Sequence, residues 1–363
     1  GATSRLTVTF KGPEIIGSGR YGIKAHNADL TFEDIDVHGI TGEGIHLENG
    51  CSIVGNNINV HDITRRESPD EAAFFISNAQ TIELSNVKVY DNHRTSNKGF
   101  DGLLINGAQS VIISDSEFSN NPSSGLGIAG VDLGTELNSI KVHDNGEHGF
   151  WESNIGSATL YNISAWDNEE DRVHIGDSDG LYGGKYTWLN YSGGEVYSNN
   201  KTGLDLRCWG NNTQISNLDV RDNLDGGISL AQMKDVIIDN VKVYTNSRNS
   251  GNGAGISLLI SNGTTKYGVV IKNSSIYENN STSNGEGIYI QAGKDNKLTL
   301  YNVTIRDNIA QYRGGGVYLE TRTVSNRKGC VAFNKVSFLR NKVKADSRFT
   351  NNRGGAGIYV TFI

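Results

Sequence analysis

Glycine followed by an aliphatic residue recurs along the whole chain and opens each unit of a repeat. A second aliphatic residue often stands two positions later, as Leu47 does after Ile45. An alternating run such as residues 111–118 comes next, and most units end on Asp-Asn or Asn-Asn. Alternation with a period of two predicts strands, whereas glycine and asparagine predict turns with a positive φ. The anchors are Gly22, Gly44, Gly102, Gly125, Gly149, Gly203, Gly227, Gly255, Gly287, Gly316 and Gly357.

Each unit is too short to bury its own hydrophobic face, so neighbouring units must stack. No stretch shows the 3.6-residue periodicity of a helix. The chain has only 3 prolines, which suits a backbone that is hydrogen-bonded in ladders. Most anchors lie roughly 22 to 32 residues apart, and a degenerate copy without glycine at residues 74–76 divides the long interval from Gly44 to Gly102. We therefore predict an all-β, single-stranded parallel β-helix of about 12 coils. The closing asparagines should stack into a hydrogen-bonded ladder.

These repeats resemble the right-handed parallel β-helix family of carbohydrate-active enzymes and phage tailspikes, over nearly the whole chain. Within that family, the Asn/Ser/Gly-rich repeats look like those of the disaggregatases of methanogenic archaea. That resemblance implies an extracellular enzyme that cleaves an acidic, amino-sugar-containing heteropolysaccharide. It carries over no catalytic positions, because the repeat specifies architecture and not chemistry. The Asp-Pro-His-Glu motif of alginate epimerases is absent, and the Asp motifs of polygalacturonases do not match.

Composition agrees with one solenoid domain spanning residues 1–363. Hydrophobic residues make up 36% of the 363, which a thin core explains. The net charge of −7 argues against a nucleic-acid partner, and no apolar run is long enough to span a membrane. A start at Gly1 and a strand-like end suggest a piece of a longer protein, and oligomers are common among such solenoids. Cys51, Cys208 and Cys330 are several coils apart, so we expect buried free thiols.

The repeat loses its spacing where the tryptophans gather. All 4 tryptophans lie between residues 151 and 209. Gly149 and Gly203 enclose a double-length unit, with Gly180 as an intermediate anchor. We therefore predict that residues 169–191 form an insertion that lines a groove, because long loops on a rigid scaffold commonly carry binding sites.

Strand alternation assigns side chains to the outward face of this groove. Aromatic rings there can stack on sugar rings, and planar polar groups can bind sugar hydroxyls. Outward Tyr289 and Tyr318 either extend this row or simply suit a pleated strand, while Trp166 should lie in the core. The candidate substrate-binding residues are Trp151, Tyr182, Arg207, Trp209, Trp188, Lys185, His148, Lys201, His174 and Arg172.

The candidate catalytic residues are the carboxylates Asp205, Asp177, Asp179 and Glu152. Glycoside hydrolysis needs one protonated and one ionised carboxyl group. Asp205 is the strongest of the four, because Asp179 before Gly180 also fits a turn. Glu152 falls on an inward position, which is either a register slip or a buried acid with a raised pKa.

Two alternatives use the same groove. A uronate lyase would employ Lys185, Lys201 or Arg207 as base and neutraliser, with Ca²⁺ held by Asp177 and Asp179. No paired Cys-x-x-Cys metal motif is present, so outside the lyase alternative no cofactor is expected. A tailspike or adhesin would bind a glycan without cleaving it, and would need the aromatic rings but no convergent acids.

Overall fold

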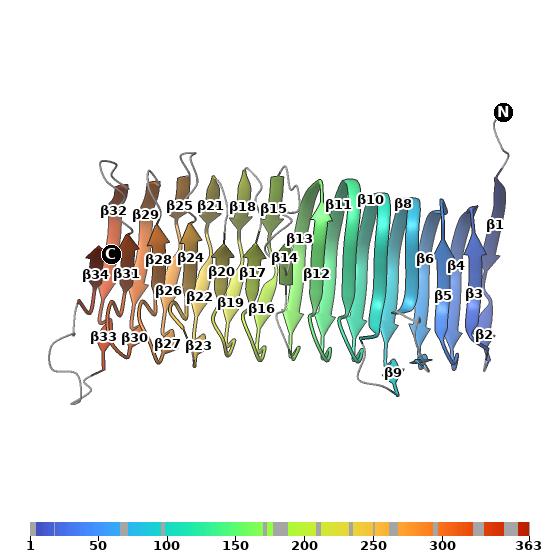
Figure 1. The fold of residues 1–363 in the computed structure, drawn as a ribbon, viewed down its shortest axis with the longest axis horizontal. Coiled ribbons are helices and arrows are strands. Elements are labelled where there is room, and N and C mark those ends of the chain that lie inside the picture. Colours follow the sequence, from blue (N-terminus) through green and yellow to red (C-terminus); the bar gives the residue numbers. More distant parts are fainter. Residues whose placement is uncertain are drawn as a thin grey trace. The chain divides into compact units, whose positions relative to one another are not determined.

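A computed structural model describes most of the chain as strands joined by turns (Figure 1). The described residues are 5–17, 19–65, 72–95, 99–169, 173–176, 188–207, 212–231, 235–249, 251–260, 268–292, 297–321, 330–344 and 355–362. They form two compact units, residues 1–170 and residues 171–363, and each is described by itself. The single-domain organisation stays a prediction. In the described residues, no helix has the length and apolar character needed to cross a membrane.

Unit 1 is built from parallel strands that pair from one coil to the next. One ladder joins β3, β5, β8, β10, β11 and β12, and another joins β1, β4, β6, β8, β10, β11 and β13. The strands are β1 (Leu6–Lys11), β2 (Glu14–Ile16), β3 (Tyr21–His26), β4 (Ala28–His38), β5 (Glu43–Glu48), β6 (Ser52–His61), β7 (Thr64–Arg65), β8 (Ala72–Tyr90), β9 (His93–Arg94), β10 (Asp101–Ser119), β11 (Leu126–His143), β12 (Phe150–Ile155) and β13 (Ser157–Trp166).

Unit 2 repeats this plan with shorter strands, again all parallel where they pair. The strands are β14 (Val173–Gly176), β15 (Trp188–Ser192), β16 (Glu195–Tyr197), β17 (Leu204–Arg207), β18 (Thr213–Ser216), β19 (Asp219–Arg221), β20 (Ile228–Ala231), β21 (Val236–Asp239), β22 (Lys242–Tyr244), β23 (Ser247–Arg248), β24 (Ile256–Ile260), β25 (Gly268–Lys272), β26 (Ser275–Tyr277), β27 (Asn280–Ser281), β28 (Ile288–Ala292), β29 (Lys297–Arg306), β30 (Ile309–Ala310), β31 (Val317–Thr321), β32 (Cys330–Leu339), β33 (Lys342–Val343) and β34 (Ile358–Phe362).

The closing asparagines form the predicted ladder inside both units. In unit 1, Asn121 Nδ2 donates to Asn145 Oδ1 at 3.0 Å, and Asn145 Nδ2 donates to Asn168 Oδ1 at 2.9 Å. In unit 2, Asn223, Asn246, Asn279 and Asn308 continue the same pattern. The backbone also bonds these amides, so the buried polar groups are satisfied. A Cβ on Gly125 would lie 2.7 Å from the Asn145 amide, which explains why the anchor is glycine.

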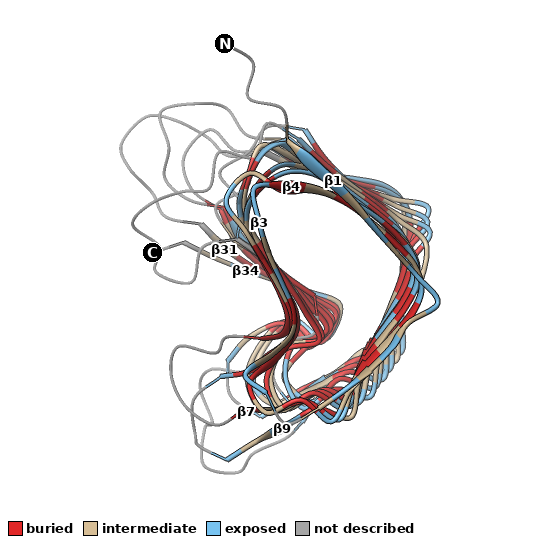
Figure 2. Ribbon diagram, turned by 90° about the vertical axis from the view of Figure 1, so that its right-hand side faces the viewer, coloured by how far each residue is buried: buried red, intermediate tan, exposed pale blue. Residues whose placement is uncertain are grey.

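Aliphatic and aromatic side chains fill the space between the strands in each unit. Buried residues line the walls that carry β3 and β4 in unit 1 (Figure 2). Cys51 is buried and free, as expected. Cys208 and the side chain of Cys330 lie outside the described residues. Trp166 differs from its predicted core position, because it is only partly buried and stacks on the His143 ring at 4.2 Å.

The structure corrects the register of the double-length unit. β14 pairs with β17, so that Val173 lies beside Leu204 and His174 beside Asp205. The anchor of this coil is therefore Val173, and the assignment of Gly180 as an anchor was wrong. This coil has the aliphatic pair Val173 and Ile175 but no glycine before it, so the nearest glycine followed by an aliphatic residue, Gly180, was assigned instead. β14 and β15 take up parts of the predicted insertion, while residues 177–187 lie outside the described ranges.

Candidate functional site

The outward side of the first strands of unit 1 carries one stacked row of side chains. The row is Lys24, His46, Phe75, Leu104, Gly127 and Trp151. We call this surface the first-strand face. Its alternation matches the sequence prediction, since inward Ile45 and Leu47 are buried whereas His46 between them is partly exposed.

Trp151 lies on this face, as predicted, with a defined orientation. Its indole packs against a cluster formed by Ala72, Phe75 and Leu104. A Cβ on Gly127 would lie 2.6 Å from the indole ring, so only glycine leaves room for this ring position. The indole Nε1 donates to Asp101 Oδ2 at 3.3 Å. The ring is therefore held between an apolar floor and a carboxyl group.

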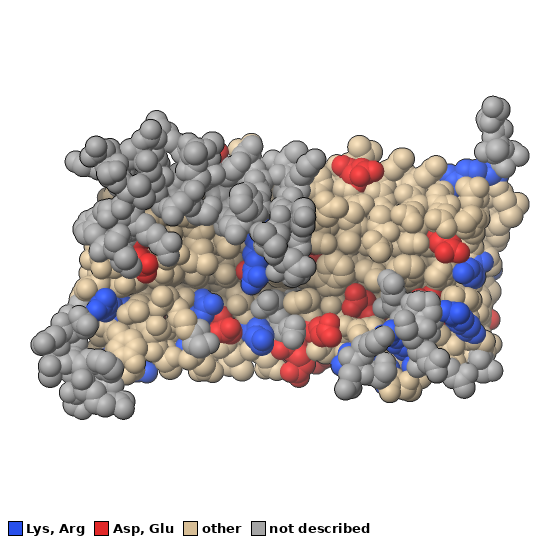
Figure 3. Space-filling model, in the orientation of Figure 1, with Lys and Arg blue, Asp and Glu red and all other residues tan. Residues whose placement is uncertain are grey.

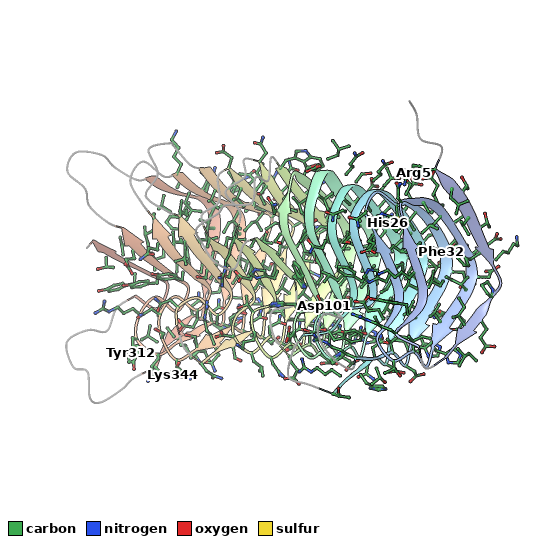
Figure 4. The ribbon with its side chains drawn as sticks, turned by 45° about the vertical axis from the view of Figure 1, so that its right-hand side comes forward. Arg5, His26, Phe32, Asp101, Tyr312 and Lys344 are labelled. Carbon is green, nitrogen blue, oxygen red and sulfur yellow. The ribbon has the colours of Figure 1, made fainter. Side chains whose placement is uncertain are left out.

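Asp101 begins β10 and is 9% exposed (Figure 4). Its Oδ1 accepts a hydrogen bond from the Ser124 backbone N–H at 3.0 Å. Burial raises the pKa of Asp101 to about 6, and the nearby Glu147 charge adds to the rise, although hydrogen bonds from Ser124 and Trp151 oppose it. A carboxyl group in this range can be protonated near neutral pH and can act as a general acid.

Glu147 supplies a second carboxyl group at the same place. Ser123 Oγ donates to Glu147 Oε2 at 2.5 Å, and the Ser123 hydroxyl also lies near enough to Asp101 to lower its pKa. The guanidinium of Arg94 lies 3.8 Å from Glu147 Oε1. We call Asp101 and Glu147 the acid pair, because the Glu147 charge acts directly on the pKa of Asp101.

Glu152 occupies the inward position that alternation predicted. It stands beside Ile128 of the preceding coil and is 0% exposed. Burial raises its pKa to about 8, and the nearby Thr135 hydroxyl opposes the rise. A fully buried side chain makes no contact with a polymer on the surface, so Glu152 is not carried into the proposed site. The sequence predicted the inward position of Glu152, but only the structure shows that the side chain is too deeply buried to touch a substrate.

A charged cluster lies further along the first-strand face. The His46 ring lies between Glu43 and Glu48, with Nδ1 toward Glu43. Lys24 approaches Glu48 at 3.2 Å and stands 4.7 Å from the centre of the Tyr21 ring. The hydrogen bond to Glu43 is the main reason why the pKa of His46 is raised, although burial opposes it. These charges neutralise one another within the protein.

In unit 2, His174, Asp205 and Arg207 meet. Asp205 is 2% exposed, and its Oδ2 lies 2.9 Å from Arg207 Nη2 and 3.4 Å from His174 Nδ1. Burial alone would raise the pKa of Asp205, but the His174 hydrogen bond and the Arg207 charge outweigh it and hold the pKa below its ordinary value. Asp205 is therefore ionised, which suits a base or a positioning carboxylate and not a general acid.

The outward tyrosines of unit 2 are not open platforms. Tyr289 and Tyr318 stack on each other at 5.7 Å, and Tyr318 stacks on Tyr359 at 5.5 Å. Tyr289 and Tyr318 are buried. Tyr289 OH donates to Glu320 Oε2 at 3.1 Å. Of the two alternatives for Tyr289 and Tyr318, the structure supports the pleated-strand one, because tyrosines on adjacent coils cover each other's ring faces.

The other predicted site residues are scattered or lie outside the described part. His148 precedes β12 and is partly exposed, Lys201 is exposed before β17, and Trp188 begins β15 with 42% exposure. The remaining candidates lie outside the described residues: Asp177, Asp179, Tyr182, Lys185, Arg172 and Trp209. The described residues contain no cluster of three or more His, Cys, Asp or Glu that could hold a metal ion. The predicted Ca²⁺ ligands, Asp177 and Asp179, are not among them.

A pocket of about 500 Å³ opens at the turns of unit 1. Four successive turns line this pocket, which we call the turn pocket, and Figure 3 shows acidic side chains gathered near the lower ends of β12 and β13. The lining residues are Asn92, His93, Arg94, Asn120, Asn121, Pro122, Asp144, Asn145, Gly146, Asp167 and Glu169.

Sequence reasoning missed Asp101 because an Asp before a glycine anchor also fits turn chemistry. A usable signal was present: the residues before successive anchors stack from coil to coil. Three of them in unit 1 are Asp101, Ser124 and His148, and the Ser124 backbone bonds the Asp101 carboxyl. Glu147 stands one position before His148 in the same turn. Polar residues just before the glycine anchors of consecutive coils were therefore the sequence signal for the acid pair.

Comparison with solved structures finds distant likenesses. The A-module of the mannuronan C-5 epimerase AlgE6 of Azotobacter vinelandii is 14% identical, with 94% of this chain and 91% of that chain covered and a TM-score of 0.38. The periplasmic alginate epimerase AlgG is 11% identical, with 87% and 78% covered and a TM-score of 0.41. The Agl-KA catalytic domain is 15% identical, with 98% and 62% covered and a TM-score of 0.39. Likenesses this distant carry no statement about function.

No curated protein matches the sequence. The family comparison does find a match, and it agrees with the stacked parallel coils and the glycine-anchored repeat. Residues 72–182 and 189–327 match the family described as right handed beta helix region, so this chain belongs to that family.

Proposed function

We propose that this chain is a carbohydrate-active enzyme that hydrolyses glycosidic bonds of a polysaccharide on the first-strand face of unit 1. The observation that carries the proposal is the acid pair, in which Ser123 donates to Glu147, the Trp151 indole donates to Asp101, and the Glu147 charge acts on Asp101. Trp151 provides an aromatic ring for a sugar, and Phe75 and Leu104 extend the apolar floor.

The two carboxyl groups differ in environment, as an acid and its partner must. Asp101 is buried and protonates near pH 6, so it donates the proton to the leaving oxygen. Glu147 is more exposed and lies beside the Arg94 guanidinium, so it supplies the negative charge that attacks or stabilises the anomeric carbon. Glu147 bonds to the anomeric carbon as the leaving oxygen departs with the Asp101 proton. Water then displaces Glu147 from that carbon, and Asp101 takes the proton that this water releases.

The closeness of the two carboxyl groups also favours one stereochemical course. Ser123 lies beside both carboxyl groups, and the Glu147 charge raises the pKa of Asp101, so the two groups are close together. Retaining glycosidases have carboxyl groups about 5 to 5.5 Å apart, whereas inverting enzymes need about 6.5 Å or more to admit a water. We therefore expect the product to keep the anomeric configuration of the substrate. Proton NMR of the anomeric signal during early hydrolysis measures this directly.

The earlier candidates in unit 2 have less support for hydrolysis. Asp205 is ionised and paired with Arg207, and the described residues place no second carboxyl group against it. A lyase that uses Arg207 as its neutralising group would have to break this ion pair. A catalytic role for Asp205 stays a prediction, as do the roles of Asp177 and Asp179.

The location of the enzyme and the source of its polysaccharide are two further parts of the proposal. An extracellular location suits the substrate, because an intact polysaccharide does not enter a cell. The disaggregatase resemblance of the repeats favours a heteropolysaccharide of a cell-aggregate matrix. Both depend on the enzymatic proposal, and culture fractionation with a matrix-dispersal assay would examine them.

The test is substitution of the acid pair. Asp101→Asn and Glu147→Gln should each lower hydrolysis by about 100-fold or more, since general acid catalysis contributes about 10²- to 10⁴-fold. Reducing ends released from a panel of polysaccharides are measured, and circular dichroism confirms folding. Glu136→Gln is the matched control, because Glu136 is exposed on β11 and lies outside the site.

Activated aryl glycosides distinguish the general acid, Asp101, from its partner Glu147. Their leaving groups need no proton, so Asp101→Asn should recover most of its loss on them, whereas Glu147→Gln should not. Full hydrolysis by folded Asp101→Asn would remove the proposal. An unsaturated, ultraviolet-absorbing product would favour the lyase, and glycan binding without any cleavage would favour an adhesin.

A further inference from the structure

The turn pocket is large enough to hold a ligand of its own. Its volume of about 500 Å³ falls within the range of small-molecule sites. Four consecutive turns form its walls, and their backbone is held by the buried ladder of Asn121 and Asn145. A cavity built on hydrogen-bonded turns keeps its shape before a ligand arrives, so little free energy is spent on ordering it.

The pocket adjoins the acid pair through the same turns. Pro122 lines the pocket and Ser123 contacts the acid pair, while Gly146 lines the pocket and Glu147 belongs to the pair. Arg94 lines the pocket and also approaches Glu147. A polymer whose scissile bond lies at the acid pair can therefore place a neighbouring sugar in the turn pocket.

Arg94 also has an unsatisfied hydrogen-bond donor. Its Nη1 is buried and has no hydrogen-bond acceptor in the described part of the chain. The 3.8 Å separation from Glu147 is too long for a hydrogen bond. A buried donor without an acceptor raises the free energy of the folded protein. The Arg94 side chain also lines the turn pocket, and a guanidinium carries several other N–H groups that can donate to an oxygen atom of a ligand.

The charged side chains that line the turn pocket favour some sugars over others. Asp144, Asp167 and Glu169 contribute carboxylates, Arg94 contributes a cation, and His93 is a further titratable group of the lining. His143 hydrogen-bonds Asp144 from outside the lining, and Asp167 and Glu169 lie exposed at the opposite wall. An excess of negative charge repels a uronate and attracts an ammonium group.

We propose that the turn pocket is a subsite for a cationic amino sugar of the polysaccharide, next to the bond cleaved at the acid pair. The proposal rests on the proposed hydrolysis for its biological meaning. The substrate class is a polymer with unacetylated hexosamine residues. The amino group faces the carboxylates of Asp167 and Glu169, and the sugar oxygens face Arg94 and the asparagine turns.

Binding of monosaccharides to the whole chain tests this without any turnover. The probes are glucosamine, N-acetylglucosamine and glucuronate at about pH 6, where the amine is protonated and the uronate is ionised. Ligand-observed NMR titration gives the three affinities. Glucosamine should bind about fivefold or more tightly than N-acetylglucosamine, and glucuronate should bind most weakly.

The double variant Asp167→Asn and Glu169→Gln localises the effect. Asp167 has a φ of 51°, a conformation that asparagine also adopts, so the turn should fold. The variant should lose the preference for glucosamine, whereas the control Glu136→Gln should keep it. Equal affinities for the three sugars, absence of binding, or a preference that survives the double variant would overturn the proposal.

The two proposals fail separately. If Asp101→Asn abolishes hydrolysis but the monosaccharides show no charge preference, the subsite is wrong and the acid pair stands. If the charge preference holds but folded Asp101→Asn hydrolyses normally, the pocket binds amino sugars and the catalytic assignment is wrong.

Discussion

Glu152 should make the stability of this protein fall steeply with pH. The side chain is 0% exposed, and its pKa rises from 4.5 to about 8 on folding. Between these two values the folded protein holds a proton that the unfolded chain releases. Stability therefore decreases as pH rises through this window and levels off above about pH 8.

The magnitude follows from the same values. A tenfold change in proton affinity is worth about 1.4 kcal/mol. Keeping Glu152 protonated at pH 7 therefore costs about 3 kcal/mol of the free energy of unfolding. Glu152→Gln is neutral at every pH and keeps the size of the side chain. Its stability should exceed that of the parent by about 3 kcal/mol near pH 7, and the gain should vanish below about pH 4.

Urea denaturation followed by tryptophan fluorescence measures the effect at several pH values. The pH dependence of the difference between parent and variant isolates Glu152, because the other titrating groups are common to both. If the amide changes the packing, it changes the free energy of unfolding by the same amount at every pH. A difference that stays constant between about pH 5 and 8 would refute the reasoning. Activity provides a second check. Because the Glu152 side chain is buried away from the substrate, Glu152→Gln should hydrolyse the polysaccharide as fast as the parent.

Three further predictions follow from individual contacts. Asn145→Ala should lower the free energy of unfolding by about 3 kcal/mol, because it leaves buried ladder groups unpaired, and a urea midpoint close to the parent's would contradict this. Gly127→Ala should push the Trp151 indole off its floor, shift its fluorescence and lower kcat/KM about tenfold or more, whereas unchanged kinetics would separate the ring from the site. Asp205→Asn should cost about 1 to 2 kcal/mol at neutral pH, a small value because Arg207 is partly exposed. The lowered pKa of Asp205 means that this contribution is lost as pH falls through the folded value, so parent and variant should converge in acid.

The repeat by itself determined the architecture. Stacked strands, the asparagine ladder and the inward position of Glu152 all follow from local spacing, because each coil contacts mainly its neighbours and repeats one pattern. The same logic failed at Gly180, where one coil keeps its aliphatic strand but lacks the glycine. It left two alternatives open for Tyr289 and Tyr318, since alternation gives the direction of a side chain but not whether a neighbour covers it.

The acid pair was decided only by the tertiary structure. Asp101 comes from the start of one coil, Ser123 from the turn that leads into the next, and Glu147 from the turn after that. Their approach depends on the register between coils, and the pKa of Asp101 depends on how Trp151 and the turns exclude water from it. The sequence determines which residues face outward, because alternation is a local property of a strand. Proximity and desolvation are properties of several coils together, so they appear only once the chain has stacked.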